Sequence, residues 1–178
     1  RGIRVKAAKL AGMRMTAAVA SIVTFFALWW LYIWDIEVIL ETDPQEHDNP
    51  AESGATSITV QLVLALGLIP LAVSDEIVID EPTHSGSLTL AALACGGAIL
   101  YLAAQAWQAH KVTGHAPWRR LGAILALIAV GTVTSLIPAI VTNALVAAIL
   151  VVTAVMSRRH HIKHFNQDPT QHDRIIEK

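Results

Sequence analysis

Long apolar segments, separated by short charged stretches, restrict the fold of this chain more than any other feature of its sequence. Of its 178 residues, 54% are hydrophobic and only 15% are charged, and the mean hydropathy is +0.52. The few charges are crowded together, which leaves apolar windows close to the ~19-residue scale that identifies membrane helices. We therefore predict an all-α fold, a polytopic transmembrane helical bundle with about five membrane helices.

The apolar segments are predicted to span the membrane, and the polar stretches are predicted to connect these spans. The first segment begins at Met13 and is about 22 residues long, enough to cross a hydrocarbon core of about 30 Å. The second segment contains Pro70. The sequence does not define the residue at which this segment leaves the membrane, because Asp75 and Glu76 precede its end. The predicted spans are 13–34, 58–79, 88–109, 121–137 and 138–156, with a basic juxtamembrane segment at 1–12, an acidic loop at 35–57, a basic loop at 110–120 and a polar, basic and His-rich tail at 157–178.

The last two spans come from one apolar stretch between Leu121 and Met156, which is too long for a single helix even when tilted. A break is expected within 132–138, because Pro138 removes a backbone donor and nearby hydroxyl groups can bond the carbonyl groups that a bend frees. The alternative is one long kinked helix.

Aromatic and basic residues near the ends of the spans predict contacts with the membrane–water interface. Trp and Tyr rings prefer the level of the lipid headgroups, and basic side chains bind anionic headgroups. The histidines and basic residues of the tail favour the same contact over a metal site. The expected interfacial anchors are Trp29, Trp30, Tyr32, Trp34, Trp118, Arg119 and Arg120.

The 13 Lys and Arg residues fall into three groups that conflict with a simple orientation. Five lie at or before the start of the first span, three lie within 110–120, and five lie in the tail. The positive-inside rule would place all three groups in the cytoplasm, but three spans separate the first two groups. Either the second segment is re-entrant or the rule is broken. We favour five crossings, since each segment is long enough, and leave the orientation open.

Several short sequence motifs, called strings below, follow one another along the chain. The strings are Ala27-Leu28-Trp29-Trp30-Leu31-Tyr32, Asp75-Glu76 with Pro82, Gly96-Gly97 with Leu100-Tyr101-Leu102, Val112-Thr113-Gly114 with Pro117-Trp118-Arg119-Arg120-Leu121, and Pro138. In this order they resemble the C-terminal half of the bacterial low-temperature-requirement A (LtrA) family over roughly residues 13–156. The resemblance implies an integral membrane protein associated with bacterial growth in the cold, without an established reaction or substrate.

Two positions depart from the family's pattern. Gln61 stands where members often carry a histidine, and the acid that follows the Trp-Trp-Leu-Tyr run falls at Asp35. Members of the family are longer and have an N-terminal half with its own motifs. The resemblance therefore implies either a fragment or a shorter relative that works with a partner.

Polar residues within the spans are the candidate functional residues. An ionisable group at the bilayer centre costs about 3 kcal/mol on insertion scales, so it faces water or the protein interior. Asp75 and Glu76 fit this description, although solvation at the membrane boundary remains the alternative. Hydrogen bonds between helices are the expected role of the uncharged polar residues Gln61, Gln105 and Asn143. Lining of a pathway is the alternative. The candidate polar pathway comprises Asp75, Glu76, Gln61 and Asn143.

The sequence contains no hydrolase, metalloprotease or nucleotide-binding motif, and we expect no catalytic residue, metal or cofactor. Asp80, Glu81 and His84 match no metal-binding spacing and are interpreted as a solvated turn. The expected function is non-enzymatic transport or permeation by a multi-pass protein of the cell membrane. Its expected partners are the lipid bilayer, including anionic headgroups, and either a missing N-terminal half or another membrane subunit, with no nucleic acid.

Two alternatives to transport remain. The first is a structural or partner-binding membrane subunit whose glycine-rich helices dock on the missing half. The second is a membrane-embedded lipid-modifying enzyme that uses His84 with Asp80 or Glu81.

Overall fold

A computed structural model describes residues 2–41, 50–83, 86–113 and 117–165, and over these ranges the chain forms five long α-helices, one short 3-10 helix and no strand. In chain order these are α1 (Gly2–Glu41), α2 (Pro50–Asp80), α3 (Leu88–Thr113), α4 (Trp118–Val133), η2 (Thr134–Leu136) and α5 (Ala139–Phe165).

Each long helix contains a stretch that is long and apolar enough to cross a membrane. These stretches are Ala8–Ile33, Ile58–Asp80, Leu88–Lys111, Trp118–Leu136 and Ala139–Ser157. The prediction of an all-α bundle with about five membrane helices is therefore confirmed.

The first two helices extend beyond the apolar segments on which they are built. α1 continues to Glu41 and α2 begins at Pro50, so much of the stretch predicted as an acidic loop is helical, and residues 42–49 lie outside the described part. α2 passes through Pro70 without interruption and ends at Asp80. Because α2 does not turn back on itself, it is not a re-entrant segment.

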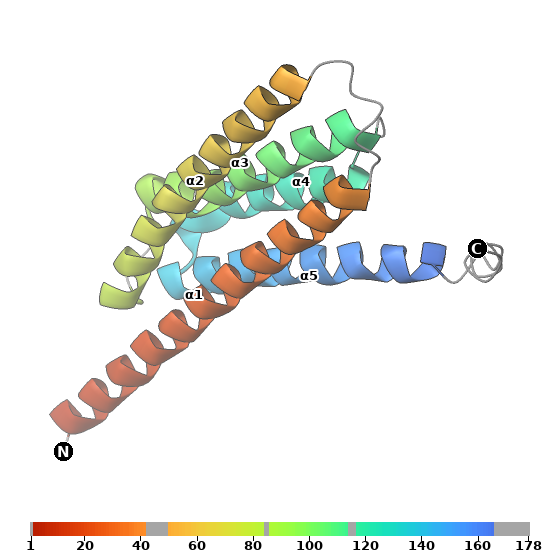
Figure 1. Ribbon diagram of the computed structural model, residues 1–178. Helices are drawn as coiled ribbons and strands as arrows, with labels where there is room; N and C mark the ends of the chain where they lie inside the picture. The colour runs from red at the N-terminus through yellow and green to blue at the C-terminus, as the bar shows by residue number, and fades with distance from the viewer. Residues whose placement is uncertain (1, 42–49, 84–85, 114–116, 166–178) are drawn as a thin grey trace.

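The tightest packing in the bundle is between α2 and α3, which form its largest interface. Gly67 and Gly97 face each other there. A Cβ atom added at Gly97 would lie 2.7 Å from the carbonyl oxygen of Gly67, so only glycine permits this approach. The second-largest interface joins α1 and α5, and Figure 1 shows these two helices crossing each other while α2 and α3 run side by side.

The apolar core lies where the helices meet, and its fully buried members include Leu28, Leu102, Leu127 and Leu150 from four different helices. α4 packs against α3 and α5.

A short irregular segment separates α4 from α5, as predicted. The helix ends at Val133, η2 follows, and Ile137 is extended before Pro138. The hydroxyl group of Thr134 donates to the carbonyl oxygen of Val130 over 2.9 Å, which satisfies a group near the end of α4. The alternative of one long kinked helix is therefore wrong.

The connection between α2 and α3 packs directly against this break. The backbone N–H of Gly86 donates to the carbonyl oxygen of Ile137 (3.1 Å), and that of Ile140 donates to the carbonyl oxygen of Pro82 (3.3 Å). A Cβ atom at Gly86 would overlap the carbonyl oxygen of Thr134. These contacts hold the two connections together at one end of the bundle.

Arg14 and Arg119, which belong to the first and second basic groups of the sequence, lie at opposite ends of the bundle. Arg14 of α1 donates to the carbonyl oxygen of Asp80 at the end of α2 (3.0 Å). Arg119, in the first turn of α4, donates to the carbonyl oxygen of Met156, near the end of α5 (3.0 Å). If all five helices cross the membrane, the positive-inside rule fails for at least one of these two groups.

Candidate functional site

Asp75 lies where α1, α2 and α5 meet, and its carboxylate is hydrogen-bonded to the side chains of Ser21 and Asn143. The amide Nδ2 of Asn143 also donates to the hydroxyl oxygen of Ser21 over 3.3 Å. Asp75 is half-buried and Asn143 is buried. We call these three residues the polar cluster. It brings together side chains from three helices that are far apart in the sequence.

Small side chains allow the helices to approach closely at this point. Ala17 lies one turn before Ser21, and Ala139 lies one turn before Asn143; both are almost fully buried. Together with Val78, one turn beyond Asp75, and Leu90 of α3, they form a separate buried apolar group. This apolar layer lies on the side of the polar cluster toward the start of α1. The half-exposed Asp75 is therefore separated by apolar side chains from that end of the bundle interior.

Beside the polar cluster and on its other side, the interior contains polar groups without partners. The hydroxyl oxygens of Thr24 in α1 and Thr142 in α5, and both polar atoms of the Gln105 side chain in α3, are buried and have no hydrogen-bond partner. Most buried polar groups in proteins are paired. These three residues are exceptions to that pattern.

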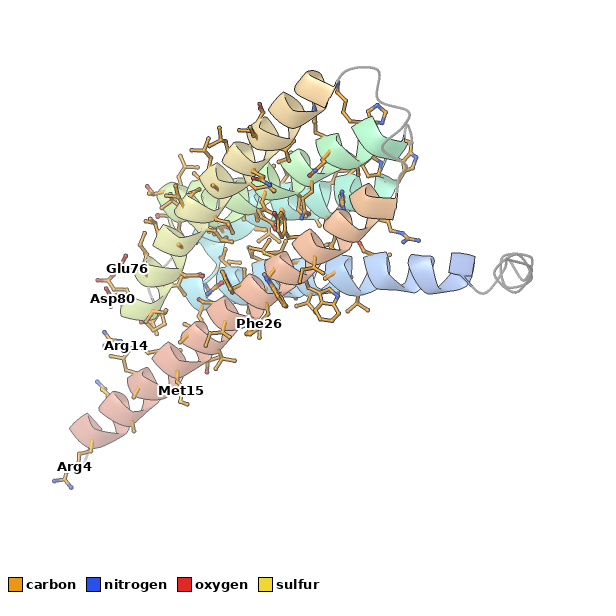
Figure 2. The ribbon with its side chains drawn as sticks, in the orientation of Figure 1. Arg4, Arg14, Met15, Phe26, Glu76 and Asp80 are labelled. Atoms are coloured by element: carbon orange, nitrogen blue, oxygen red, sulfur yellow. The ribbon has the colours of Figure 1, made fainter. Side chains whose placement is uncertain are left out.

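The structure separates two members of the predicted polar pathway from the other two. Asp75 and Asn143 are in direct contact. Glu76 is exposed, and Figure 2 shows it on the outer side of the end of α2, close to Asp80. Adjacent residues on a helix point about 100° apart, which explains why only one of the two acids faces the interior.

Gln61, the remaining pathway candidate, is exposed on α2 and contributes to a different feature. It lines an open cleft of about 290 Å³ among α1, α2 and α3. The lining is almost entirely apolar and comprises Phe25, Leu28, Trp29, Tyr32, Gln61, Leu64, Ala65, Leu68 and Tyr101. Gln61 therefore does not join the polar cluster.

Most of the predicted interfacial anchors are exposed on the surface of the bundle, and Arg120 is the exception. Trp29, Trp30, Trp118 and Arg119 are exposed and Tyr32 is half-buried, whereas the side chain of Trp34 lies outside the described part. Arg120 is only 9% exposed and donates a 2.7 Å hydrogen bond to the carbonyl oxygen of Gln105. The first turn of α4 rests on α3, so Arg120 binds protein rather than lipid headgroups.

Within the described ranges, no three His, Cys, Asp or Glu side chains are grouped closely enough to hold a metal ion. Asp80 and Glu81 are exposed, and His84 lies outside the described residues, so the geometry of the proposed lipid-modifying site is not defined.

Sequence reasoning missed Ser21, Thr24 and Thr142. The available signal was weak: Ser21 and Thr24 share a helix face with Ala17 and Leu28, at spacings of three, four and seven residues. Isolated hydroxyl residues are common in apolar helices, where they bond their own backbone.

Comparison with known proteins gives two matches. The model of the family described as bacterial low temperature requirement A protein (LtrA) matches residues 2–155. The chain is also 26% identical, over 136 residues, to an uncharacterized protein of Rhizobium meliloti (strain 1021). That match covers 76% of this chain and 33% of the relative, so the chain spans about a third of the relative's length. No solved structure shows a significant match.

Proposed function

The chain belongs to the bacterial low temperature requirement A (LtrA) family, and from that premise we propose that it is a permeation element that carries a small cation across the cell membrane by way of Asp75. Growth at low temperature, the requirement in the family's name, then depends on this flux.

The observation that carries the proposal is the position of the Asp75 carboxylate inside a membrane-crossing segment, bonded to side chains of two other helices. Ionisable groups within membrane-spanning segments are rare and commonly mark ion pathways. A structural role alone would be served by the neutral amide of asparagine. The acid adds a negative charge that attracts and releases a cation, while Ser21 and Asn143 supply neutral oxygen atoms beside it.

The main structural alternative, a subunit whose glycine-rich helices dock on a partner, receives less support. Gly97 is already in contact with Gly67 of the same bundle. The small-residue face of α3 therefore serves the internal α2–α3 interface. The hydrogen-bond partners of Asp75 also come from this bundle, so the chain can be tested on its own.

The test compares two adjacent substitutions that remove the same charge. The purified protein is reconstituted in liposomes, and an imposed membrane potential drives charge movement that a potential-sensitive dye reports. Asp75→Asn should slow this movement by about tenfold or more, which corresponds to a barrier increase of about 1.4 kcal/mol. Glu76→Gln, at the exposed neighbouring position, should leave it within about twofold of wild type.

Equal elution volumes and equal helix content establish that both variants fold. Undiminished charge movement in Asp75→Asn, or equal losses in both variants, would show that Asp75 is not the pathway residue.

A further inference from the structure

The open cleft among α1, α2 and α3 lies where the first two helices move apart. Figure 1 shows α1 and α2 close together near the end of α2 and diverging toward the end of α1. At the close end, Arg14 bonds the carbonyl oxygen of Asp80 (3.0 Å). The cleft residues of these two helices fall within 25–32 and 61–68, toward the diverging end. Direct packing of α1 against α2 therefore does not fill this space.

The cleft opens sideways, toward the lipid. Four of its lining residues are exposed: Phe25, Trp29, Gln61 and Ala65. All four belong to stretches that are long and apolar enough to cross a membrane, Ala8–Ile33 and Ile58–Asp80. On the inner side the buried Tyr101 of α3 closes the cleft, and its hydroxyl group donates to the carbonyl oxygen of Leu28 over 2.9 Å. A molecule in the bilayer therefore has direct access to the cleft.

The polar lining residues lie near the membrane surface, and the apolar ones lie deeper. Tyr32 directly precedes the last residue of the α1 stretch, and Gln61 is the fourth residue of the α2 stretch. At about 1.5 Å per residue, both lie within about 5 Å of the ends of these stretches. Phe25 and Leu68 lie a further seven residues along their helices, or about 10 Å. The cleft is therefore polar near the surface and apolar toward the bilayer centre.

This change from polar to apolar matches the structure of a lipid molecule. The amide of Gln61 offers two donors and an acceptor, and the phenol of Tyr32 donates and accepts, so both suit ester and phosphate oxygens. Below them the lining offers hydrocarbon to an acyl chain. The volume of about 290 Å³ is near the lower end of the range for small-molecule sites. It suits one chain better than an α-helix, which is about 10 Å across with its side chains.

The sequence next to the polar end of the cleft carries only negative charge. Residues 34–57, which join the two membrane-crossing stretches, contain seven acids and no Lys or Arg. The acids are Asp35, Glu37, Glu41, Asp43, Glu46, Asp48 and Glu52. Negative charge at the membrane surface repels an anionic headgroup and attracts an ammonium group.

We propose that the cleft is a binding site for one bilayer lipid whose headgroup carries an ammonium group, as in phosphatidylethanolamine. One acyl chain lies between α1 and α2, and Gln61 bonds the ester or phosphate oxygens. Asp75 lies nearer the other end of α2 and does not line the cleft. The inference therefore does not depend on the permeation function.

The experiment uses the full chain in liposomes of phosphatidylglycerol with a trace of phosphatidylethanolamine that has a photoreactive group in one acyl chain. After illumination and proteolysis, mass spectrometry measures attachment to residues 25–32 and 61–68. Exposed apolar residues of α4, namely Leu121, Leu125 and Ile128, report contact with bulk lipid in the same sample. Attachment in the cleft should exceed attachment on α4 by about fivefold or more, a difference of about 1 kcal/mol in binding.

Competition and a headgroup exchange test whether this attachment reflects a site. Replacing part of the phosphatidylglycerol by unlabelled phosphatidylethanolamine should suppress attachment in the cleft and leave attachment on α4 unchanged. A phosphatidylglycerol probe with the same photoreactive chain should attach to the cleft about threefold less or weaker still.

Two variants alter the cleft itself. Ala65→Phe fills it and should reduce attachment there by about fivefold or more, whereas Ala72→Phe, at an exposed position of α2 outside the cleft, should stay within about twofold of wild type. Gln61→Leu removes the amide and should reduce attachment by about threefold. Elution volume and helix content establish folding. If Ala65→Phe fails to fold, Gln61→Leu and the competition in wild type decide the question.

Equal attachment to the cleft and to α4, or attachment in the cleft that unlabelled phosphatidylethanolamine does not reduce, would mean that bulk lipid fills the cleft and would overturn the inference. A cleft that prefers the phosphatidylglycerol probe would overturn the assigned headgroup. Absence of lipid from the cleft, together with photocrosslinks between two protein copies through a reactive residue at position 65, would identify a protein helix as the occupant instead.

Discussion

The guanidinium group of Arg120 donates a 2.7 Å hydrogen bond to the carbonyl oxygen of Gln105, and Arg120 is buried while it does so. The adjacent Arg119 makes a similar bond of 3.0 Å to the carbonyl oxygen of Met156, but from an exposed position. These neighbours bind the same kind of group and differ in their access to solvent.

This difference predicts unequal effects of removing the two arginines. Arg120→Ala should reduce the free energy of unfolding by about 2 kcal/mol or more, since a buried hydrogen bond to a charged group contributes about 1.5–3 kcal/mol. Arg119→Ala should cost at most about 1 kcal/mol, as exposed charged contacts do. Unfolding in mixed micelles, followed by helix content, measures both. Equal losses would contradict the assigned burial of Arg120.

The contact between Gly67 and Gly97 predicts a sharp difference between the two consecutive glycines of α3. Gly97→Ala places a Cβ atom 2.7 Å from the carbonyl oxygen of Gly67 and should cost about 1–3 kcal/mol of stability. At Gly96 an added Cβ meets nothing within 4 Å. Gly96→Ala should therefore be neutral or stabilise the helix by up to about 1 kcal/mol. The same unfolding measurement applies, and a destabilised Gly96→Ala would contradict the orientation of α3 in its packing against α2.

The Tyr101 hydroxyl group provides a third test of the packing. Tyr101→Phe removes its hydrogen bond to the carbonyl oxygen of Leu28 while keeping the ring, and should cost about 0.5–1.5 kcal/mol. Tyr32→Phe, at a half-buried position in α1, serves as the control for loss of a phenol in detergent. A larger loss in the control than in Tyr101→Phe would argue against the bond between α1 and α3.

The arrangement of helix ends predicts which positions share a side of the membrane. Single cysteines at Lys9, Thr83 and Lys111 are introduced after Cys95→Ala removes the buried native thiol. An impermeant thiol reagent should label positions 9 and 83 from one side and position 111 from the other. Labelling of 83 and 111 from the same side would mean that α3 does not cross.

The spans were predictable because length and apolarity alone determine whether a helix can cross a membrane. The break between α4 and α5 was predictable as well, because Pro138 and the hydroxyl groups before it are local signals. Both features depend on residues close together in the sequence, and neither requires knowledge of which helix packs against which.

The polar cluster was less accessible to prediction because it depends on rotation and on distant contacts. The helices are apolar on all sides, so the sequence gives no amphipathic face that would orient them. Asp75 and Glu76 are adjacent, as are Arg119 and Arg120, and in each pair only packing decides which side chain turns inward. Ser21 and Asn143 are 122 residues apart, and nothing in either segment indicates the other.

The pairing of α1 with α5 has a consequence for how the protein is made. α2 and α3 are neighbours in the chain, whereas α1 has its largest interface with α5, the last of the described helices. During synthesis α1 is therefore made before its main partner, and the interface between α1 and α5 forms only after the ribosome has completed α5. Because Asn143 belongs to α5, a chain halted before that helix lacks one of the three side chains of the polar cluster and cannot complete it.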